Sequence, residues 1–146
     1  MVGTPIRLAK EAAIAAAETL APEDYFGVIA FDGEPFHGNP PQPALELIAA
    51  SQKDQIRDRI SRIVAGGGTD VFKALLGAYQ MLKAPSVRTP IRHVVLLTDG
   101  LTDIADFKTL VTRMTEDGIT ITTVCIAAME FDNKLLANIA QWGKGR

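Results

Sequence analysis

Three short apolar runs, set apart by longer segments with helical spacing, constrain the fold of this chain most. They cover residues 25–31 (YFGVIAF), 93–98 (HVVLLT) and 119–127 (ITITTVCIA). Each is of strand length and rich in β-branched or aromatic residues. Runs with little polar alternation are typical of strands covered on both faces of a parallel sheet. The sequence therefore predicts an α/β fold with a mostly parallel sheet flanked by helices on both faces.

The segments between the runs predict about five helices. A sheet of three strands is too small for that many helices to pack on its two faces. Apolar residues at helical spacing predict helices over residues 5–20, 51–65, 71–83, 107–117 and 135–142. We expect residues 44–50 to add one or two helical turns. Ser51, with Asp54 three residues on, resembles a capping box that opens the second helix. Because the chain begins and ends in a helix, we expect strands to be missing at both ends.

Length and composition indicate one ordered domain over residues 1–146. Apolar residues make up 47% and charged residues 22%, as in ordinary globular proteins, and the formal net charge is −2. No basic surface is implied, so we expect no nucleic-acid partner. The sequence has neither a signal peptide nor an apolar run of membrane-spanning length, which favours a soluble protein and leaves the compartment open. The single cysteine, Cys125, is expected to be a buried structural thiol.

Two short motifs place oxygen ligands where a sheet edge is expected. Residues 65–70 (AGGGTD) open a predicted helix, and residues 96–100 (LLTDG) end a predicted strand. In open α/β sheets, ligands bind beyond the carboxyl ends of the strands. The hydroxyl of Thr69 and the carboxylate of Asp99 are ligands that suit a hard divalent cation. Gly67 and Gly68 allow the backbone to approach such a ligand closely.

Two further aspartates are candidates for the rim of this site. Asp70 follows Thr69 directly, and Asp103 lies shortly after Asp99. Each motif also has a purely structural interpretation. Thr69, Asp70 or Asp103 could cap a helix, and residues 99–100 could form a turn. Neither histidine has a cysteine or second histidine at metal-ligand spacing, so zinc is not expected.

Four segments in a fixed order give the chain a family resemblance. They are residues 4–13 (TPIRLAKEAA), 26–31 (FGVIAF), 67–70 (GGTD) and 95–100 (VLLTDG). Together they resemble a von Willebrand factor A domain of bacterial type, over essentially the whole chain. The resemblance implies a doubly wound, Rossmann-like fold with one antiparallel edge strand. It also implies a metal-ion-dependent adhesion site for Mg²⁺ or Mn²⁺, in which Thr69 and Asp99 match two ligand positions.

The sequence departs from the family pattern at its start. The family's remaining ligands come from an Asp-x-Ser-x-Ser motif after the first strand, and this chain contains no such motif. Residues 1–3 stand directly before the first predicted helix, so we expect the first strand to lie upstream of Met1. Residues 143–146 stand where such domains turn into their last strand. With two of the usual ligands, metal binding is expected to be weak or absent.

The resemblance favours an interaction module over an enzyme. In the family, a divalent cation captures an acidic side chain of a protein partner. One alternative is a metal-dependent phosphoryl-transfer enzyme with Asp99 as nucleophile or metal ligand, although no lysine follows Asp99 until Lys108. Another is a fragment that binds nothing. Removing a central strand would expose strand edges, so we also expect a homo-oligomer.

Overall fold

The computed structural model describes residues 3–31, 43–64, 70–84, 89–98, 105–126 and 133–146. Helices and strands largely alternate along this part of the chain, as expected for an α/β fold. In chain order they are α1 (Thr4–Thr19), β1 (Tyr25–Val28), β2 (Leu45–Ala49), α2 (Lys53–Ser61), α3 (Val71–Lys83), β3 (Arg92–Thr98), α4 (Phe107–Glu116), β4 (Ile119–Cys125) and α5 (Asn133–Trp142). None of these helices is long and apolar enough to span a membrane.

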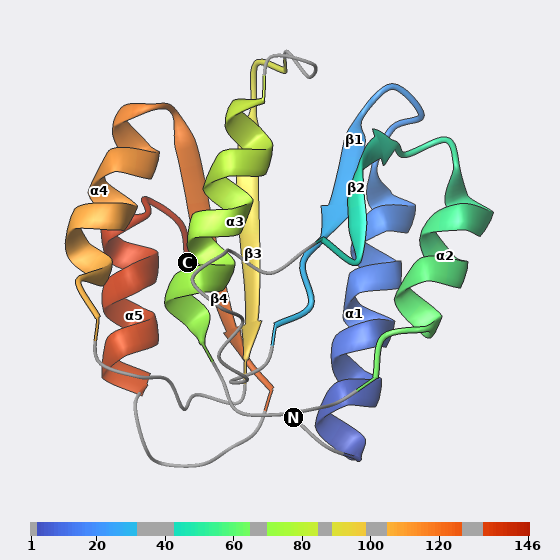
Figure 1. Ribbon diagram of the computed structural model, residues 1–146, viewed down its shortest axis with the longest axis horizontal. Helices are drawn as coiled ribbons and strands as arrows, with labels where there is room; N and C mark the ends of the chain where they lie inside the picture. Colours follow the sequence, from blue (N-terminus) through green and yellow to red (C-terminus); the bar gives the residue numbers. More distant parts are fainter. Residues whose placement is uncertain (1–2, 32–42, 65–69, 85–88, 99–104, 127–132) are drawn as a thin grey trace.

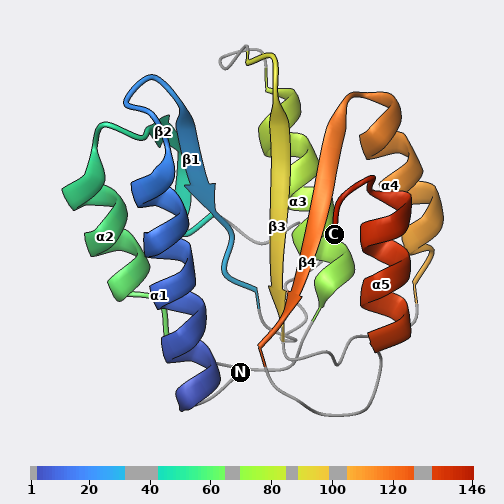
Figure 2. The same ribbon diagram turned by 180° about the vertical axis from the view of Figure 1, so that it is seen from behind.

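The strands form two separate pairs within the described residues. β3 and β4 are parallel and in register from Arg92↔Ile119 to Thr98↔Cys125. β1 and β2 are antiparallel, with an irregularity between Phe26 and Val28. The pairs stand side by side, and no ladder joins them in the described part of the chain (Figure 1, Figure 2). β1 lies nearer to β3 than β2 does, and β1 and β3 point the same way.

The prediction of helical turns over residues 44–50 is wrong. Leu45–Ala49 is strand β2, which pairs with β1 from Tyr25↔Ala49 to Val28↔Leu45. The capping box at Ser51 is also wrong, because α2 begins at Lys53 and its N-cap Gln52 makes no side-chain capping bond. The backbone N–H of Ser51 instead donates to the carbonyl of Pro22 at 3.2 Å, which holds Ser51 in the connection after β2.

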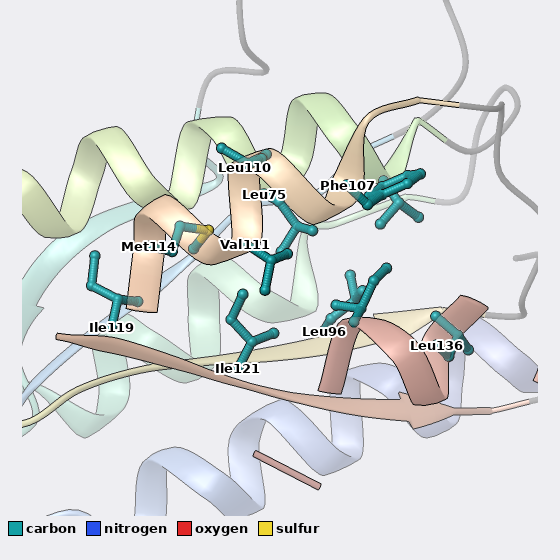
Figure 3. Packing of buried hydrophobic residues seen from close by; sticks show 11 residues of the cluster. Leu75, Leu96, Phe107, Leu110, Val111, Met114, Ile119, Ile121 and Leu136 are labelled. Atoms are coloured by element: carbon teal, nitrogen blue, oxygen red, sulfur yellow. The ribbon is translucent and has the colours of Figure 1, made fainter. Parts of the chain in front are cut away.

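The larger core lies between the β3–β4 pair and helices α3, α4 and α5. In Figure 3, side chains of α4 face Ile119 and Ile121 of β4, and Leu96 of β3 lies nearby. The apolar residues at helical spacing in α4 are all buried: Phe107, Leu110, Val111 and Met114. Fully burying one such side chain stabilises the fold by roughly 1.5–3 kcal/mol. This cluster therefore fixes the helices that begin beside the carboxyl ends of the strands.

A smaller core holds α1 and α2 against the β1–β2 pair. Its buried members are Ala17, Leu45, Ile56 and Ile60. Lys53 joins the two helices, because its ammonium group donates to the carbonyls of Ala17 at 2.5 Å and Leu20 at 3.2 Å. A cation at the C-terminal carbonyls of a helix is electrostatically favourable.

Two burial predictions are corrected by the packing around β3 and β4. The buried side chains of this pair, Leu96, Thr98, Ile119 and Ile121, lie on one face, whereas on the other face Val95 is 51% and Val124 39% exposed. The expectation that this strand pair is buried on both faces is therefore wrong within the described chain, because α3, α4 and α5 pack on the first face. Cys125, expected to be buried, is exposed at the last position of β4.

After α5 the chain runs beside β4, at the position where the resemblance places a last strand. Lys144 forms a parallel bridge with Ile121. The N–H of Ile121 donates to the Gly143 carbonyl at 2.9 Å, and the N–H of Thr123 donates to the Arg146 carbonyl at 2.8 Å. The outer edge of β4 is thus paired, whereas β3 has β4 as its one partner among the described strands.

Candidate functional site

The carboxyl ends of the strands and the first turns of several helices meet at one edge of the molecule. In both views the ends of β1, β3 and β4 point toward the edge at which α1, α3, α4 and α5 begin (Figure 1, Figure 2). The rings of Phe72 and Phe107 lie 5.7 Å apart in an edge-to-face arrangement, which joins the first turns of α3 and α4. The N–H of Ile126 donates to the Thr98 carbonyl at 2.9 Å, which joins the ends of β4 and β3.

The predicted metal ligands flank described residues at this edge. Thr69 directly precedes Asp70, the N-cap of α3, and Asp99 directly follows Thr98, the last residue of β3. Thr69 and Asp99 themselves lie outside the described residues. The rim candidates Gly67, Gly68 and Asp103 also lie outside them. That the Thr69 hydroxyl and the Asp99 carboxylate face one another therefore stays a prediction. It is supported by where α3 starts and β3 ends.

Asp70 is the rim candidate that the structure describes, and its carboxylate caps α3. Its Oδ1 accepts the backbone N–H of Lys73 at 3.0 Å, and its Oδ2 lies 3.0 Å from the Lys73 ammonium group. Both oxygens are therefore engaged by the same residue. The capping interpretation of Asp70 is confirmed by this geometry.

A second aspartate at this edge, Asp106, is missing from the sequence-based candidates. Asp106 is the N-cap of α4, and its Oδ1 accepts the N–H of Thr109 at 3.1 Å. Hydrogen bonding to Thr109, with a smaller contribution from the charge of Lys108, lowers the pKa of Asp106 below its usual value. The N-cap of α4 is thus Asp106, and Asp103, for which a capping role was considered, lies outside the described residues. The sequence signal that could have identified Asp106 as the cap is an aspartate directly before the first apolar residue of a helical pattern.

The chemistry of the two predicted ligands fits a hard divalent cation. A threonine hydroxyl and an aspartate carboxylate supply the oxygen atoms that Mg²⁺ and Mn²⁺ prefer. In the part of the chain that the structure describes, no three His, Cys, Asp or Glu side chains cluster as a metal site. Any cation at this edge would therefore depend on the loops between the described elements.

The order of these elements and motifs agrees with a known family. The sequence profile of the von Willebrand factor type A domain matches residues 1–144. The chain belongs to the von Willebrand factor type A family. Domains of this family are protein-interaction and adhesion modules, generally not enzymes.

Curated relatives of this von Willebrand factor type A chain are much longer proteins. The uncharacterized protein YfbK of Escherichia coli K12 is 27% identical over 107 residues, covering 70% of this chain and 19% of YfbK. Human inter-alpha-trypsin inhibitor heavy chain H4 is 32% identical over 105 residues, covering 68% of this chain and 11% of the inhibitor chain. The chain therefore spans less than a fifth of the length of these relatives.

Solved structures show the same fold. A von Willebrand factor type A protein from Catenulispora acidiphila superposes with a TM-score of 0.71 at 26% identity, covering 96% of this chain and 33% of that one. The conserved hypothetical protein BatB from Bacteroides thetaiotaomicron gives a TM-score of 0.72 at 17% identity, covering 96% and 77% of the two chains. The expected α/β von Willebrand factor type A fold is confirmed, with small sheets in the described residues.

Proposed function

We propose that this chain is a protein-interaction module that captures an acidic side chain of a partner through Mg²⁺ or Mn²⁺ held by Thr69 and Asp99. The supporting observation is the convergence of the end of β3 and the start of α3 at one edge, since these elements adjoin the two ligands. A divalent cation prefers oxygen ligands, and a partner carboxylate would complete its coordination.

Each ligand has a distinct part in this proposal. Asp99 supplies the negative charge that attracts the cation. Thr69 supplies a neutral oxygen, so the cation keeps a net positive charge for an incoming carboxylate. Because this sequence offers two of the family's ligand positions, the cation would retain most of its water and bind weakly.

Retention on an acidic surface tests this function directly. We expect the chain to bind immobilised poly-L-glutamate in millimolar MnCl₂ and to be released by EDTA. Asp99→Ala should abolish the Mn²⁺-dependent fraction. Asp117→Asn is the matched control, because Asp117 lies at the C-terminal end of α4, away from this edge.

Retention on poly-L-glutamate that does not depend on the metal would reject the proposal. Equal retention in MnCl₂ and EDTA, or unchanged retention of Asp99→Ala, would show that the predicted ligands play no part. No retention under either condition, in a chain that is folded by circular dichroism, would favour the alternative of a fragment that binds nothing.

A further inference from the structure

The two strand pairs belong to two units that pack separately. The smaller unit holds α1, β1, β2 and α2, within residues 3–28 and 43–64, and the larger unit holds the elements from α3 to α5. No ladder joins the two strand pairs in the described part of the chain, and the two buried clusters share no residue. With the interactions of Val71, Thr98 and Cys125 left aside, the hydrogen bonds and ion pairs between described residues each join two residues of one unit.

An apolar contact between α3 and β1 connects the two units. The terminal methyl group of Met81 lies 3.2 Å from the position that a Cβ atom at Gly27 would take. The absence of a side chain at Gly27 thus leaves room for α3 to approach β1. Met81 is half-buried and belongs to neither buried cluster. Phe31, which follows β1, also packs against the cluster of the larger unit.

The smaller unit has the smaller core. Among the described residues its buried cluster has four members, whereas the buried cluster of the larger unit has eleven. Burial of apolar side chains is the main favourable contribution to folding, so the smaller unit should be the less stable one. Proteins commonly unfold in such local units, which often coincide with supersecondary motifs, while the rest of the chain stays folded.

We propose that the smaller unit unfolds separately from the larger one, that the contact of Met81 with Gly27 holds it closed, and that its opening controls access to the edge of β3. In the folded chain β1 stands beside that edge, on the side away from β4 (Figure 1, Figure 2). Another chain can pair with β3 there only after β1 has moved away. The partner is a second copy of this chain, because β3 carries no charge between His93 and Thr98 that would repel the same strand of another copy.

Hydrogen exchange followed by mass spectrometry at micromolar concentration tests the separate unfolding. We expect peptides from α2 to exchange through an opening of lower free energy than peptides from α4. Leu110→Ala removes a side chain from the larger core and should speed exchange in α4 while leaving α2 unchanged. Equal acceleration of both helices would show that the chain unfolds as one unit and would overturn the proposal. Should Leu110→Ala fail to fold, the milder Ile121→Val, also in the larger core, replaces it.

Met81→Ala tests the contact that holds the smaller unit closed. It removes the methyl group beside Gly27 and leaves both buried clusters intact. We expect exchange in α2 to become about tenfold faster, the effect of losing one or two buried methylene-sized groups. Gln80→Ala, at the neighbouring exposed position, is the matched control and should leave exchange in α2 unchanged. Exchange in α2 at the parent rate in Met81→Ala would overturn the role of this contact.

The rate of self-association, followed by light scattering after a rise in concentration, tests the access to β3. We expect Met81→Ala to associate faster than the parent by the same factor as its exchange in α2, and Gln80→Ala to match the parent. Adding Val95→Lys to Met81→Ala should abolish the gain, because an edge lysine opposes strand pairing. Faster exchange in α2 without faster association, or a gain that survives Val95→Lys, would overturn the control of access to β3.

Discussion

Gly143 controls how the segment after α5 packs beside β4. A Cβ atom added at Gly143 would lie 2.7 Å from Cβ of Ile121 and 2.9 Å from the carbonyl of Ile139. Both neighbours are fixed, since Ile121 and Ile139 are fully buried. Gly143 is therefore required by the close approach of the chain to the strand.

Replacing this glycine should weaken the fold. We expect Gly143→Ala to lower the free energy of unfolding by roughly 1–3 kcal/mol, as overpacking in a core does. Urea denaturation of parent and variant measures this difference. Gln141→Ala, at an exposed position of α5, is the control and should change stability by less than about 0.5 kcal/mol. Equal stability of Gly143→Ala and parent would show that the segment after α5 can move away from Ile121.

The proposed metal site also gives a prediction at the scale of single residues. We expect Mg²⁺ or Mn²⁺ to bind this chain with a dissociation constant of about 1 mM or weaker, because a cation with two protein ligands keeps most of its water. Isothermal titration of parent and Asp99→Ala measures it. Micromolar binding that Asp99→Ala abolishes would contradict the expected weakness.

The distance between the two ligands is a separate prediction. We expect the Thr69 hydroxyl and the Asp99 carboxylate to lie about 4–7 Å apart, since oxygen–metal bonds are near 2.1 Å and one water can intervene. A crystal structure grown with MnCl₂ would measure it. Placement of the two side chains at opposite ends of the sheet would contradict the proposed site.

Helices α3 and α4 and strand β3 are tied together by a polar network at the end opposite the candidate site. The Tyr79 hydroxyl donates to Asp117 at 2.5 Å, and the Lys83 ammonium group lies 2.9 Å from the same carboxylate oxygen. The Arg92 guanidinium donates to the backbone carbonyl of Asp117. The hydrogen bond from Tyr79, followed by that from Lys83, holds the pKa of Asp117 below its usual value.

This network should make stability depend on pH in the acid range. A carboxylate with a lowered pKa stabilises the fold above its unfolded pKa, and this stabilisation is lost as pH falls through the folded value. We expect the melting temperature of the parent to fall below about pH 4 more steeply than that of Asp117→Asn. Thermal melts from pH 2 to pH 7 test this, and parallel curves would contradict it.

The same network should also make stability depend on pH in the alkaline range, where stability falls as pH rises. Its hydrogen bond to Asp117 raises the pKa of Lys83, with a further contribution from Tyr79. The stabilisation is therefore present below the unfolded pKa of Lys83 and lost as pH rises through the folded value. Lys83→Met should lack this alkaline loss above about pH 10, as thermal melts would show.

The capping bond of Asp106 should contribute to the stability of α4. Asp106→Ala leaves the N–H of Thr109 without its side-chain acceptor. We expect a loss of about 0.5–2 kcal/mol in unfolding free energy, measured by urea denaturation. Asp106→Asn keeps an acceptor and should retain most of that stability. Equal losses in the two variants would indicate that the charge of Asp106, and not its capping bond, matters.

At the scale of the whole molecule, β3 lacks the features that normally protect an edge strand. No Lys, Pro or Gly lies between His93 and Thr98, and Val95 is half exposed. Within the described chain β3 pairs with β4 alone. Because unpaired strand groups recruit other strands, we expect copies of this chain to associate through the β3 edge.

Light scattering coupled to size exclusion tests this association. The parent should elute as an oligomer, and Val95→Lys should shift it toward the monomer, because an edge lysine opposes strand pairing. Val95→Thr keeps a β-branched residue and is the control for folding. A parent that stays monomeric at millimolar concentration would contradict the prediction.

Local sequence patterns were sufficient to predict parts of the fold and of the candidate site. The spacing of Phe107, Leu110 and Met114 predicted the buried face of α4, because one amphipathic helix carries that information in a dozen residues. At the site, an aspartate before a helical pattern indicated the cap at Asp70. The pairing of Asp70 with Lys73 was not predicted, because it depends on how the side chain of Lys73 is oriented.

The sequence by itself determined the alternation of helices and strands, the family and the two candidate ligands, since these follow from periodicity and ordered motifs. Only the tertiary structure decided that Leu45–Ala49 is a strand, because its ladder partner is β1, about twenty residues away. It also decided which face of β3 is covered, and so left Val95 exposed, and it placed Cys125 at the exposed end of β4. Apolar runs record a preference for burial, but which side chains are buried depends on the elements that pack against them.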